Sequence, residues 1–384
     1  GTTNATVTLG DNRVAGDALV LAGTGTFASK DVGTAKPVNV TGINITGADA
    51  GNYTFNTTAT TAADITARAL TVSATGQNKV YDGTTNATVT LSDNRVAGDA
   101  LILAGTGAFA SKDVGTAKAV SVTGINVTGT DAGNYTFNTT ATTAADITAR
   151  ALTVSATGQN RVYDGTTNAT VTLGDNRVAG DALALSHATA SFPDKNVGTA
   201  KTVNVTGINV TGTDAGNYTF NTTATTAADI TARALTVSAT GQNKVYDGTT
   251  NATVTLGDNR VAGDNLSLAG TASFLNKNVG TAKTVNVTGI NVTGTDAGNY
   301  TFNTTATTAA DITPRALTAG GIGISRVYDG TTNASVTPTD NRVAGDVLTL
   351  TGTPAFADKH VGTAKTINIT GITVTGTDAG NYTF

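Results

Sequence analysis

Four residue types that often carry chemistry or fill protein cores are missing from this sequence of 384 residues: cysteine, methionine, tryptophan and glutamate. Without cysteine the chain has no disulfide bonds, no thiol nucleophiles and no thiolate metal ligands. Charged residues make up only 13% of the chain and leave a net charge of -4, whereas about 25% is usual in globular proteins. The basic residues are scattered singly, so we expect no nucleic acid partner.

Two further absences limit the possible classes of function. No apolar run approaches the roughly 18 residues that a membrane-spanning helix needs, so we expect no membrane insertion in this segment. The only histidines, His187 and His360, occupy non-equivalent places in the repeats described next. Neither cysteine nor glutamate is available to complete a nucleophilic or metal-binding constellation. We therefore expect that the chain is not an enzyme.

Five near-copies of one unit fill the sequence. The tetrapeptide Asn-Tyr-Thr-Phe recurs at steps of 82 or 83 residues, beginning at Asn52, Asn134, Asn217, Asn299 and Asn381. A unit of this length is too large for one coil of a solenoid and indicates a small domain with its own core. The predicted repeats are residues 1–66, 67–148, 149–231, 232–313 and 314–384. Repeat 1 is incomplete at its start and repeat 5 at its end, so we expect a window from a longer array.

Each repeat alternates between apolar and polar residues, as half-buried β-strands do. In repeat 2, residues 69–76 alternate strictly, and residues 87–91 and 120–122 repeat the pattern. The alternation slips by one position across Gly124, which predicts a β-bulge there. The alternating run of residues 135–147 is too long for so small a domain, and we expect it to break into two strands.

The same patterns predict the fold class. No segment keeps a helical period of 3.6 residues, and the surface residues Thr, Asn, Ser and Gly favour strands and turns. Six or seven short strands per repeat predict an immunoglobulin-like β-sandwich. Consecutive repeats join without a flexible linker, for example at residues 63–72, which indicates a short, stiff connection. We predict an all-β tandem array of such sandwiches that forms an elongated rod of about 200 Å.

The tripeptide Tyr-Asp-Gly recurs near the start of repeats 2 to 5. It stands at Tyr81-Asp82-Gly83, Tyr163-Asp164-Gly165, Tyr246-Asp247-Gly248 and Tyr328-Asp329-Gly330. One interpretation is a ligand-contacting loop with an aromatic platform and a carboxylate. The structural interpretation, which we favour, is that the tyrosine packs beside the apolar strands while Asp-Gly makes a tight turn.

Aspartates recur at other fixed places, which in repeat 2 are Asp93, Asp99, Asp131 and Asp146. If these carboxylates converge near a junction between repeats, they would bind calcium, which would stiffen the array. No EF-hand or nonapeptide calcium repeat is present. Asx turns explain the same residues without a metal, and we favour that explanation.

Asn-X-Thr sequences, the acceptors of N-glycosylation, are also dense. In repeat 2 they lie at Asn86, Asn126, Asn134 and Asn138. Glycosylation is physically reasonable on exposed strands. A chain rich in Asn and Thr also produces such sequences by chance, so both explanations are open.

Four short motifs of repeat 2 together resemble the YDG repeat of large bacterial surface proteins. They are Val-Tyr-Asp-Gly-Thr-Thr at residues 80–85, Val-Ala-Gly-Asp at 96–99, Lys-Asp-Val-Gly at 112–115 and Asp-Ala-Gly-Asn-Tyr at 131–135. The resemblance covers every copy. It implies an extracellular protein at the bacterial cell surface, similar to filamentous-haemagglutinin-like exoproteins of two-partner secretion, in which such repeats form adhesin stalks. It implies no catalytic residues.

Three functions are compatible with these observations. The first, which we favour, is a stalk whose partners are its own neighbouring repeats and which projects a binding tip from the cell. The second is a self-assembling filament or biofilm-matrix protein, because the Lys, Glu and Pro residues that discourage edge pairing are sparse. The third is a multivalent weak binder of glycans, such as extracellular polysaccharide, through the repeated Tyr, Asp and Asn loops.

Overall fold

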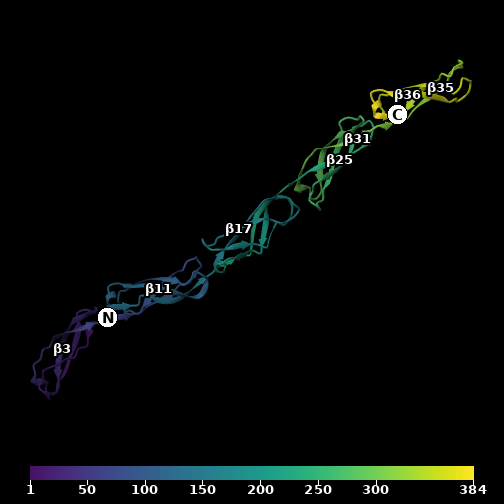
Figure 1. Ribbon diagram of the computed structural model, residues 1–384. Helices are drawn as coiled ribbons and strands as arrows, with labels where there is room; N and C mark the ends of the chain where they lie inside the picture. Colours follow the sequence, from purple (N-terminus) through teal and green to yellow (C-terminus); the bar gives the residue numbers. More distant parts are fainter. The chain divides into compact units, whose positions relative to one another are not determined.

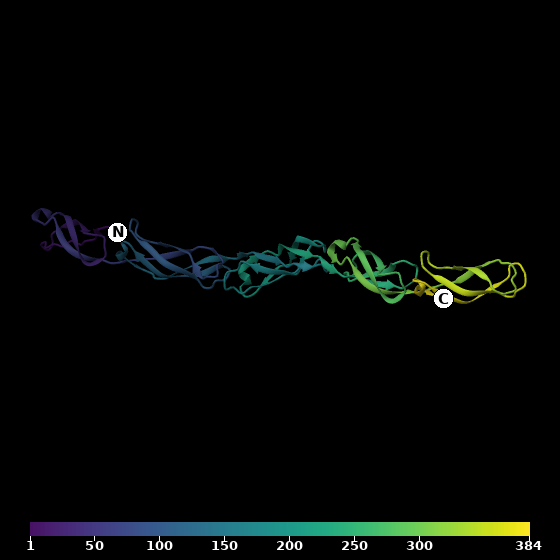
Figure 2. The same ribbon diagram turned by 90° about the horizontal axis from the view of Figure 1, so that it is seen from above.

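The computed structural model describes all residues, 1–384, and contains β-strands and five single-turn 3-10 helices but no α-helix. Strands occur in every repeat along the chain (Figures 1 and 2). It contains no helix of the length and hydropathy that crossing a membrane requires. The predicted all-β class and the tandem array of β-structured repeats are confirmed.

The chain divides into two compact units. The first comprises Gly1–Ser155, Leu173–Ala188 and Gly207–Ala224, and the second comprises Ala156–Thr172, Thr189–Thr206 and Thr225–Phe384. Repeat 3 contributes to both units. The contacts of repeat 2 with repeats 1 and 3 lie inside the first unit, and the contacts of repeat 4 with repeats 3 and 5 lie inside the second.

Repeat 4 shows the architecture most completely. Its elements are β24 (Arg233–Leu235), β25 (Val237–Gln242), β26 (Lys244–Val245), β27 (Asn251–Asp258), β28 (Ser267–Phe274), β29 (Gly280–Thr293), η4 (Ala297–Asn299), β30 (Tyr300–Phe302) and β31 (Ala306–Thr313). Six strands form one sheet in the order β25-β27-β28-β29-β31-β26. Because β25 and β26, the two edge strands in this order, are consecutive in sequence, the sheet curls so that its two edges lie close together.

The other repeats reuse this plan. Repeat 1 has β1 (Asn4–Ala5), β2 (Val20–Phe27), β3 (Gly33–Thr46), η1 (Ala50–Asn52) and β4 (Ala59–Ile65). Repeat 2 has β5 (Arg68–Leu70), β6 (Val72–Gly76), β7 (Lys79–Val80), β8 (Asn86–Ala87), β9 (Val89–Asp93), β10 (Ile102–Phe109), β11 (Gly115–Thr128), η2 (Ala132–Asn134), β12 (Tyr135–Phe137) and β13 (Ala141–Thr148). Its five-stranded sheet has the order β7-β13-β11-β10-β8.

The sheets of repeats 3 and 5 contain fewer strands than the six-stranded sheet of repeat 4. Repeat 3 has β14 (Arg150–Leu152), β15 (Val154–Gly158), β16 (Arg161–Val162), β17 (Val171–Asp175), β18 (Ala184–Ser186), β19 (Thr189–Ser191), β20 (Gly198–Thr206), β21 (Asn209–Thr211), η3 (Ala215–Asn217), β22 (Tyr218–Phe220) and β23 (Thr223–Thr231). Repeat 5 has β32 (Arg315–Ala316), β33 (Ala319–Ile324), β34 (Ser335–Asp340), β35 (Thr349–Phe356), β36 (Ile367–Thr375), η5 (Ala379–Asn381) and β37 (Tyr382–Thr383).

Two local predictions are confirmed in repeat 2. The run of residues 135–147 breaks into β12 and β13. A bulge lies at Gly124, because Ala104 pairs with Asn126 whereas Thr106 pairs with Thr123, so β11 carries one extra residue. Gly124 takes a φ of 63° there, a left-handed conformation that glycine adopts without a Cβ clash.

Parallel strand pairs are the feature that the alternation did not predict. The long hairpins are antiparallel, as in β10–β11 and β28–β29. Near the beginning and end of repeat 2, however, β5 pairs parallel to β12, and β7 pairs parallel to β13. Alternation identifies strands and their buried face but leaves the partner and its direction undetermined.

Candidate functional site: the contact between consecutive repeats

The tyrosine of the Tyr-Asp-Gly turn reaches the following repeat. Tyr81 comes directly after β7, and its backbone N–H donates to the carbonyl of Thr148 at the end of β13 (2.9 Å). The side chain, which is 0% exposed, therefore lies where repeat 2 meets repeat 3. Its hydroxyl donates to Asp181 of repeat 3, whose two carboxylate oxygens lie 2.9 and 3.0 Å away.

A lysine joins the same carboxylate from the earlier repeat. The Nζ of Lys112 lies 2.9 Å from Asp181 Oδ1 and 2.7 Å from Asp214 Oδ1. The hydroxyl of Tyr218 also donates to Asp181 (2.6 Å), so this buried carboxylate accepts from three side chains. We call Tyr81, Lys112, Asp181, Asp214 and Tyr218 the junction cluster of repeats 2 and 3.

Equivalent junction clusters lie at the other three contacts. Their residues are Lys30, Asp99, Asp131 and Tyr135 between repeats 1 and 2, Tyr163, Lys195, Asp264, Asp296 and Tyr300 between repeats 3 and 4, and Tyr246, Lys277, Asp346, Asp378 and Tyr382 between repeats 4 and 5. The first cluster has no tyrosine from the earlier repeat.

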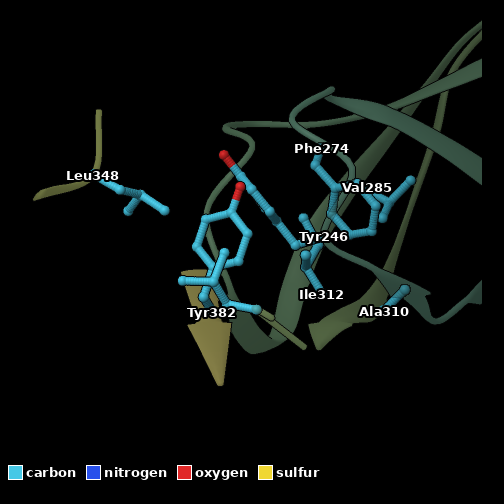
Figure 3. Close-up of a cluster of buried hydrophobic side chains, with 8 residues drawn as sticks. Tyr246, Phe274, Val285, Ala310, Ile312, Leu348 and Tyr382 are labelled. Atoms are coloured by element: carbon cyan, nitrogen blue, oxygen red, sulfur yellow. The ribbon is translucent and has the colours of Figure 1, made fainter. Parts of the chain in front are cut away.

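Apolar packing continues across the same contact, as Figure 3 shows for repeats 4 and 5. Tyr382 and Leu348 of repeat 5 lie in one buried cluster with Tyr246, Phe274 and Ile312 of repeat 4. The rings of Tyr246 and Tyr382 meet edge to face, with centroids 5.5 Å apart and an interplanar angle of 73°. Such an aromatic pair contributes about 0.5–1.5 kcal/mol beyond its buried area.

Two more motif residues bridge repeats 2 and 3. The Oδ1 of Asn217, which is buried, accepts from the backbone N–H of Val114 (2.9 Å). Gly83 has a φ of 79°, and a Cβ at this position would lie 2.8 Å from the Cγ1 of Val178. Glycine is therefore required both by the backbone conformation and by the close approach of the next repeat.

All four repeated motifs thus place side chains at one contact, and a comparison with known families finds one domain repeated five times along the chain. The YDG domain model matches residues 1–62, 66–144, 148–227, 231–309 and 313–384. The chain belongs to the YDG domain family. No curated protein matches the sequence at a significant level.

The name-giving YDG tripeptide has two separable parts. Asp82 accepts from the backbone N–H and the hydroxyl of Thr84 (both 2.9 Å) and from Lys79 (2.8 Å). This is an Asx turn within one repeat, and Asp164, Asp247 and Asp329 repeat it. The tyrosine, in contrast, is buried between its own repeat and the next, as Tyr246 is by Ile312 of repeat 4 and Tyr382 of repeat 5. Only Tyr328 is exposed (58%), beside a hollow of about 390 Å³.

The electrostatics of the junction cluster favour its charged carboxylate and its neutral tyrosines. Burial alone would raise the pKa of Asp181, but hydrogen bonds from Tyr218, Lys112 and Tyr81 outweigh it and hold the pKa below its ordinary value. Burial, and then the hydrogen bond to Asp181, raises the pKa of Tyr218 to about 12. The bonds of Lys112 to Asp214 and Asp181 raise its pKa, so the cluster keeps its ion pairs over a wide pH range.

The structure separates the four aspartates considered as calcium ligands. Asp99 and Asp131 meet at a contact between repeats, where both bind the ammonium of Lys30 (2.6 Å each). Asp93 pairs with Arg95 (2.5 Å), and Asp146 accepts from the backbone N–H of Ala117 (2.8 Å). No group of three His, Cys, Asp or Glu side chains with the spacing of a metal site is present.

The predicted glycosylation sites also separate into two kinds. Asn86 and Asn126 are exposed on strands. The Oδ1 of Asn134 accepts from Val32 of repeat 1 (2.8 Å), and Asn138 bonds both backbone groups of Val72 (2.8 and 3.0 Å). A glycan on Asn134 or Asn138 would displace these bonds, so the exposed pair is the better candidate for modification.

Sequence reasoning missed the contact made by Lys112 of the junction cluster and the contact made by Asn217 beside it. The low charge content could have pointed to the lysine. In a chain with 13% charged residues, a lysine that recurs at one place in every repeat is expected to have a recurring acceptor. Sequence patterns do not reveal that this acceptor lies in the following repeat.

Proposed function

We propose that the chain is a stalk segment of a large extracellular bacterial adhesin, in which successive repeats hold a binding tip away from the cell surface. One observation carries the proposal: the four motifs that define the YDG repeat place Tyr81, Lys112, Asp181 and Asn217 at the contact between two repeats. A stalk needs repeated residues that join each repeat to the next, because its length depends on each repeat holding the orientation of the one that follows.

The cellular setting rests on the resemblance of the motifs to repeats of secreted adhesins. It comprises the extracellular location, the two-partner secretion and the adhesive tip. Neighbouring repeats are the proposed partners of each repeat. The buried tyrosines Tyr81, Tyr163 and Tyr246 are unavailable as platforms for sugars, which argues against the glycan-binding alternative.

Small-angle scattering with in-line light scattering on the purified chain, with and without calcium, tests the proposal. A stalk predicts a monomer with a maximum dimension near the roughly 200 Å expected for five aligned domains of this size, unchanged by calcium. A compact particle would overturn the stalk. A concentration-dependent polymer would favour the filament instead, and a calcium-dependent length would show metal-stiffened contacts.

A triple variant links this measurement to the junction clusters. Lys112→Ala, Lys195→Ala and Lys277→Ala together remove the ammonium groups that join adjacent repeats, and we expect a broader distribution of dimensions. The matched control removes Lys118, Lys201 and Lys283, whose ammonium groups bind Ser111, Asp194 and Asn276 of their own repeats. The control should keep the wild-type profile although its net charge is the same.

A further inference from the structure

In repeat 2, the first segment of the repeat pairs with its last segment, and the two run parallel. In β5 and β12, Arg68 pairs with Tyr135 and Leu70 with Phe137. Further along the same two segments, in β7 and β13, Lys79 pairs with Ile147 and Val80 with Thr148. The first and last segments of the repeat therefore run side by side over residues 68–80 and 135–148.

Side chains reinforce the backbone bonds between these segments. Asn138 accepts from the N–H of Val72 (2.8 Å) and donates to its carbonyl (3.0 Å). Asn78 accepts from the N–H of Asp146 (2.7 Å) and donates to its carboxylate (3.3 Å). Each asparagine thus uses its whole amide to join the first segment of the repeat to the last.

Repeats 3 and 4 keep both elements of this arrangement. Their parallel pairs are β14–β22, β16–β23, β24–β30 and β26–β31. The residues equivalent to Asn78 and Asp146 are Asn160 with Asp229 (2.7 Å) and Asn243 with Asp311 (2.7 Å). The residues equivalent to Asn138 are Asn221 and Asn303, which bond Val154 and Val237 (2.8 Å each).

The direction of these strands determines how tension acts on them. Tension along the chain pulls the first segment towards its N-terminus and the last segment towards its C-terminus. Because the two segments are parallel neighbours, this pull slides one along the other, and the hydrogen bonds between them, which lie across the strands, are all loaded together. In an antiparallel hairpin pulled apart at its open end, the same bonds break one after another.

We propose that the first and last segments of each inner repeat form a clamp loaded in shear, so that the array bears tension as well as spanning distance. The biological use of the clamp rests on the proposed stalk function, whereas its mechanics do not. Scattering tests the stalk and single-molecule pulling tests the clamp, so one proposal can fail without the other.

Pulling one repeat of the full chain in two directions is the decisive experiment, because the absence of native cysteine makes engineered cysteines specific handles. Handles at Ala67→Cys and Ala149→Cys load the clamp of repeat 2 in shear. Handles at Ile102→Cys and Thr130→Cys peel the β10–β11 hairpin from its open end, where Ile102 pairs with Thr128. At equal force, we expect unfolding in shear to be at least about tenfold slower, since several bonds must break together.

The opening in shear should release the whole repeat, whose extended length is about 280 Å at roughly 3.5 Å per residue. The chain should lengthen by this amount less the distance between the two handles in the folded repeat. Equal unfolding rates in the two directions would overturn the clamp. Both variants carry two cysteines in the same repeat. Chemical denaturation measures the stability of each variant, so a difference in stability can be separated from the effect of the pulling direction.

Neighbouring side chains offer a second test. Asn78→Ala, Asn160→Ala and Asn243→Ala remove the bonds to the last segment, and we expect end-to-end unfolding to become about tenfold faster. The control changes the preceding residue, as Gln77→Ala, Gln159→Ala and Gln242→Ala. These glutamines bond Thr90, Thr172 and Thr255, which belong to neither the first nor the last segment of their repeats. Equal acceleration in both triple variants, or none in the asparagine variant, would contradict the proposal.

Discussion

The fourth and fifth repeats carry the same tripeptide in the same local turn, yet they bury its tyrosine to very different extents. Asp247 and Asp329 each accept from a threonine two residues later at 2.9 Å, and Gly248 and Gly330 have φ values of 79° and 81°. Tyr246 is 1% exposed, whereas Tyr328 is 58% exposed. Tyr246 is covered by Ile312 of β31 in its own repeat and by Asp346 and Tyr382 of repeat 5. Residues 314–384 contain neither an equivalent of β31 nor a later repeat to cover Tyr328.

The comparison shows that the YDG tripeptide combines a turn that forms by itself with a side chain that depends on a neighbour. The aspartate and glycine determine the path of the backbone within one repeat. The tyrosine hydroxyl gains its hydrogen bond from the next repeat, and the ring is buried between the last strand of its own repeat and the next repeat. Substitutions in repeat 4 and the same substitutions in repeat 5 can therefore separate the stability of the turn itself from the stability that the last strand of the repeat and the next repeat add.

Truncation of the tyrosine should give the largest difference. Tyr246→Ala removes a buried ring from the shared core of repeats 4 and 5, which we expect to cost about 3–5 kcal/mol, as for other buried aromatic residues. Tyr328→Ala should cost less than about 0.5 kcal/mol, as at exposed positions. Hydrogen exchange of the Val279 amide, which donates to Asn381 across the contact (2.9 Å), measures the free energy of opening.

A control measurement distinguishes local opening at the contact between repeats 4 and 5 from unfolding of the whole chain. The amides of β2 and β3 in repeat 1 should keep their protection in the Tyr246→Ala variant, because they lie far along the chain from the substituted contact. If the two tyrosine substitutions changed the protection of Val279 equally, the burial of Tyr246 would not stabilise the contact.

Acid should have the second-largest effect, by weakening the contact between repeats 4 and 5. Burial would raise the pKa of Asp346, but hydrogen bonds from Lys277, Tyr382 and Tyr246 lower it below its ordinary value of 3.8. The folded state thus binds this proton more weakly than the unfolded state, so the contribution of Asp346 is present above about pH 4 and is lost as the pH falls through the lowered pKa. Near-ultraviolet circular dichroism, which reports only Tyr and Phe here because tryptophan is absent, should be constant from pH 7 to about 4 and decline below.

Alkali ionises a different group of the same junction cluster, the hydroxyl of Tyr382. Burial, and then the hydrogen bond to Asp346, raises the pKa of Tyr382 to about 12. Its contribution is therefore present below about pH 10 and is lost as the pH rises towards that value. The absorbance titration of the Tyr382→Phe variant should lack one of the late-ionising tyrosines. A loss of tyrosine dichroism already at pH 6 would contradict this description of the cluster.

Replacement of the tripeptide's glycine isolates the contact with the next repeat from backbone strain. Gly248→Ala and Gly330→Ala both place a Cβ at a positive φ, which costs about 1–2 kcal/mol. Only the Cβ at position 248 would also lie 2.6 Å from the Cγ1 of Val343, whereas the Cβ at position 330 meets nothing within 4 Å. We expect an additional loss of about 1–3 kcal/mol at position 248 from this overpacking, measured by thermal and chemical denaturation. Equal losses would show that Val343 moves aside freely.

Much of the fold could be predicted from residues close together in sequence. Alternation located most strands, including the break between β12 and β13, and the phase slip located the bulge at Gly124. These features depend on local geometry: side chains alternate along a strand, and one extra residue reverses that alternation. The tight turn at Asp82-Gly83 was predicted for the same reason, because the partner of Asp82, Thr84, is two residues away.

The junction cluster could not be predicted in this way, and the reason is the repetition itself. Tyr81 binds Asp181, 100 residues away, while the equivalent Asp99 of its own repeat is 99 − 81 = 18 residues away. Both aspartates stand in the same Val-Ala-Gly-Asp motif, so chemistry does not distinguish them. The parallel pairs pose the same difficulty, because alternation does not say which strand is the neighbour.

The turn aspartate should provide the smallest difference, and it tests the other half of the comparison. Asp247→Ala and Asp329→Ala remove the same two bonds to Thr249 and Thr331. If the turn forms independently of the next repeat, exchange of the Thr249 and Thr331 amides should accelerate by the same factor, about tenfold for one lost hydrogen bond to each amide.

Each of these variants serves as the control for the other, because the two turns share their bonds to threonine, whereas only the turn of repeat 4 lies beside a last strand and a following repeat. The Asp247→Ala change should leave the Val279 amide protected, since Asp247 bonds within repeat 4 and not to repeat 5. A much larger acceleration at Thr249 than at Thr331 would mean that repeat 5 stabilises the turn as well as the tyrosine. The aspartate would then belong to the inter-repeat contact, and the whole tripeptide, rather than its tyrosine and glycine, would join consecutive repeats.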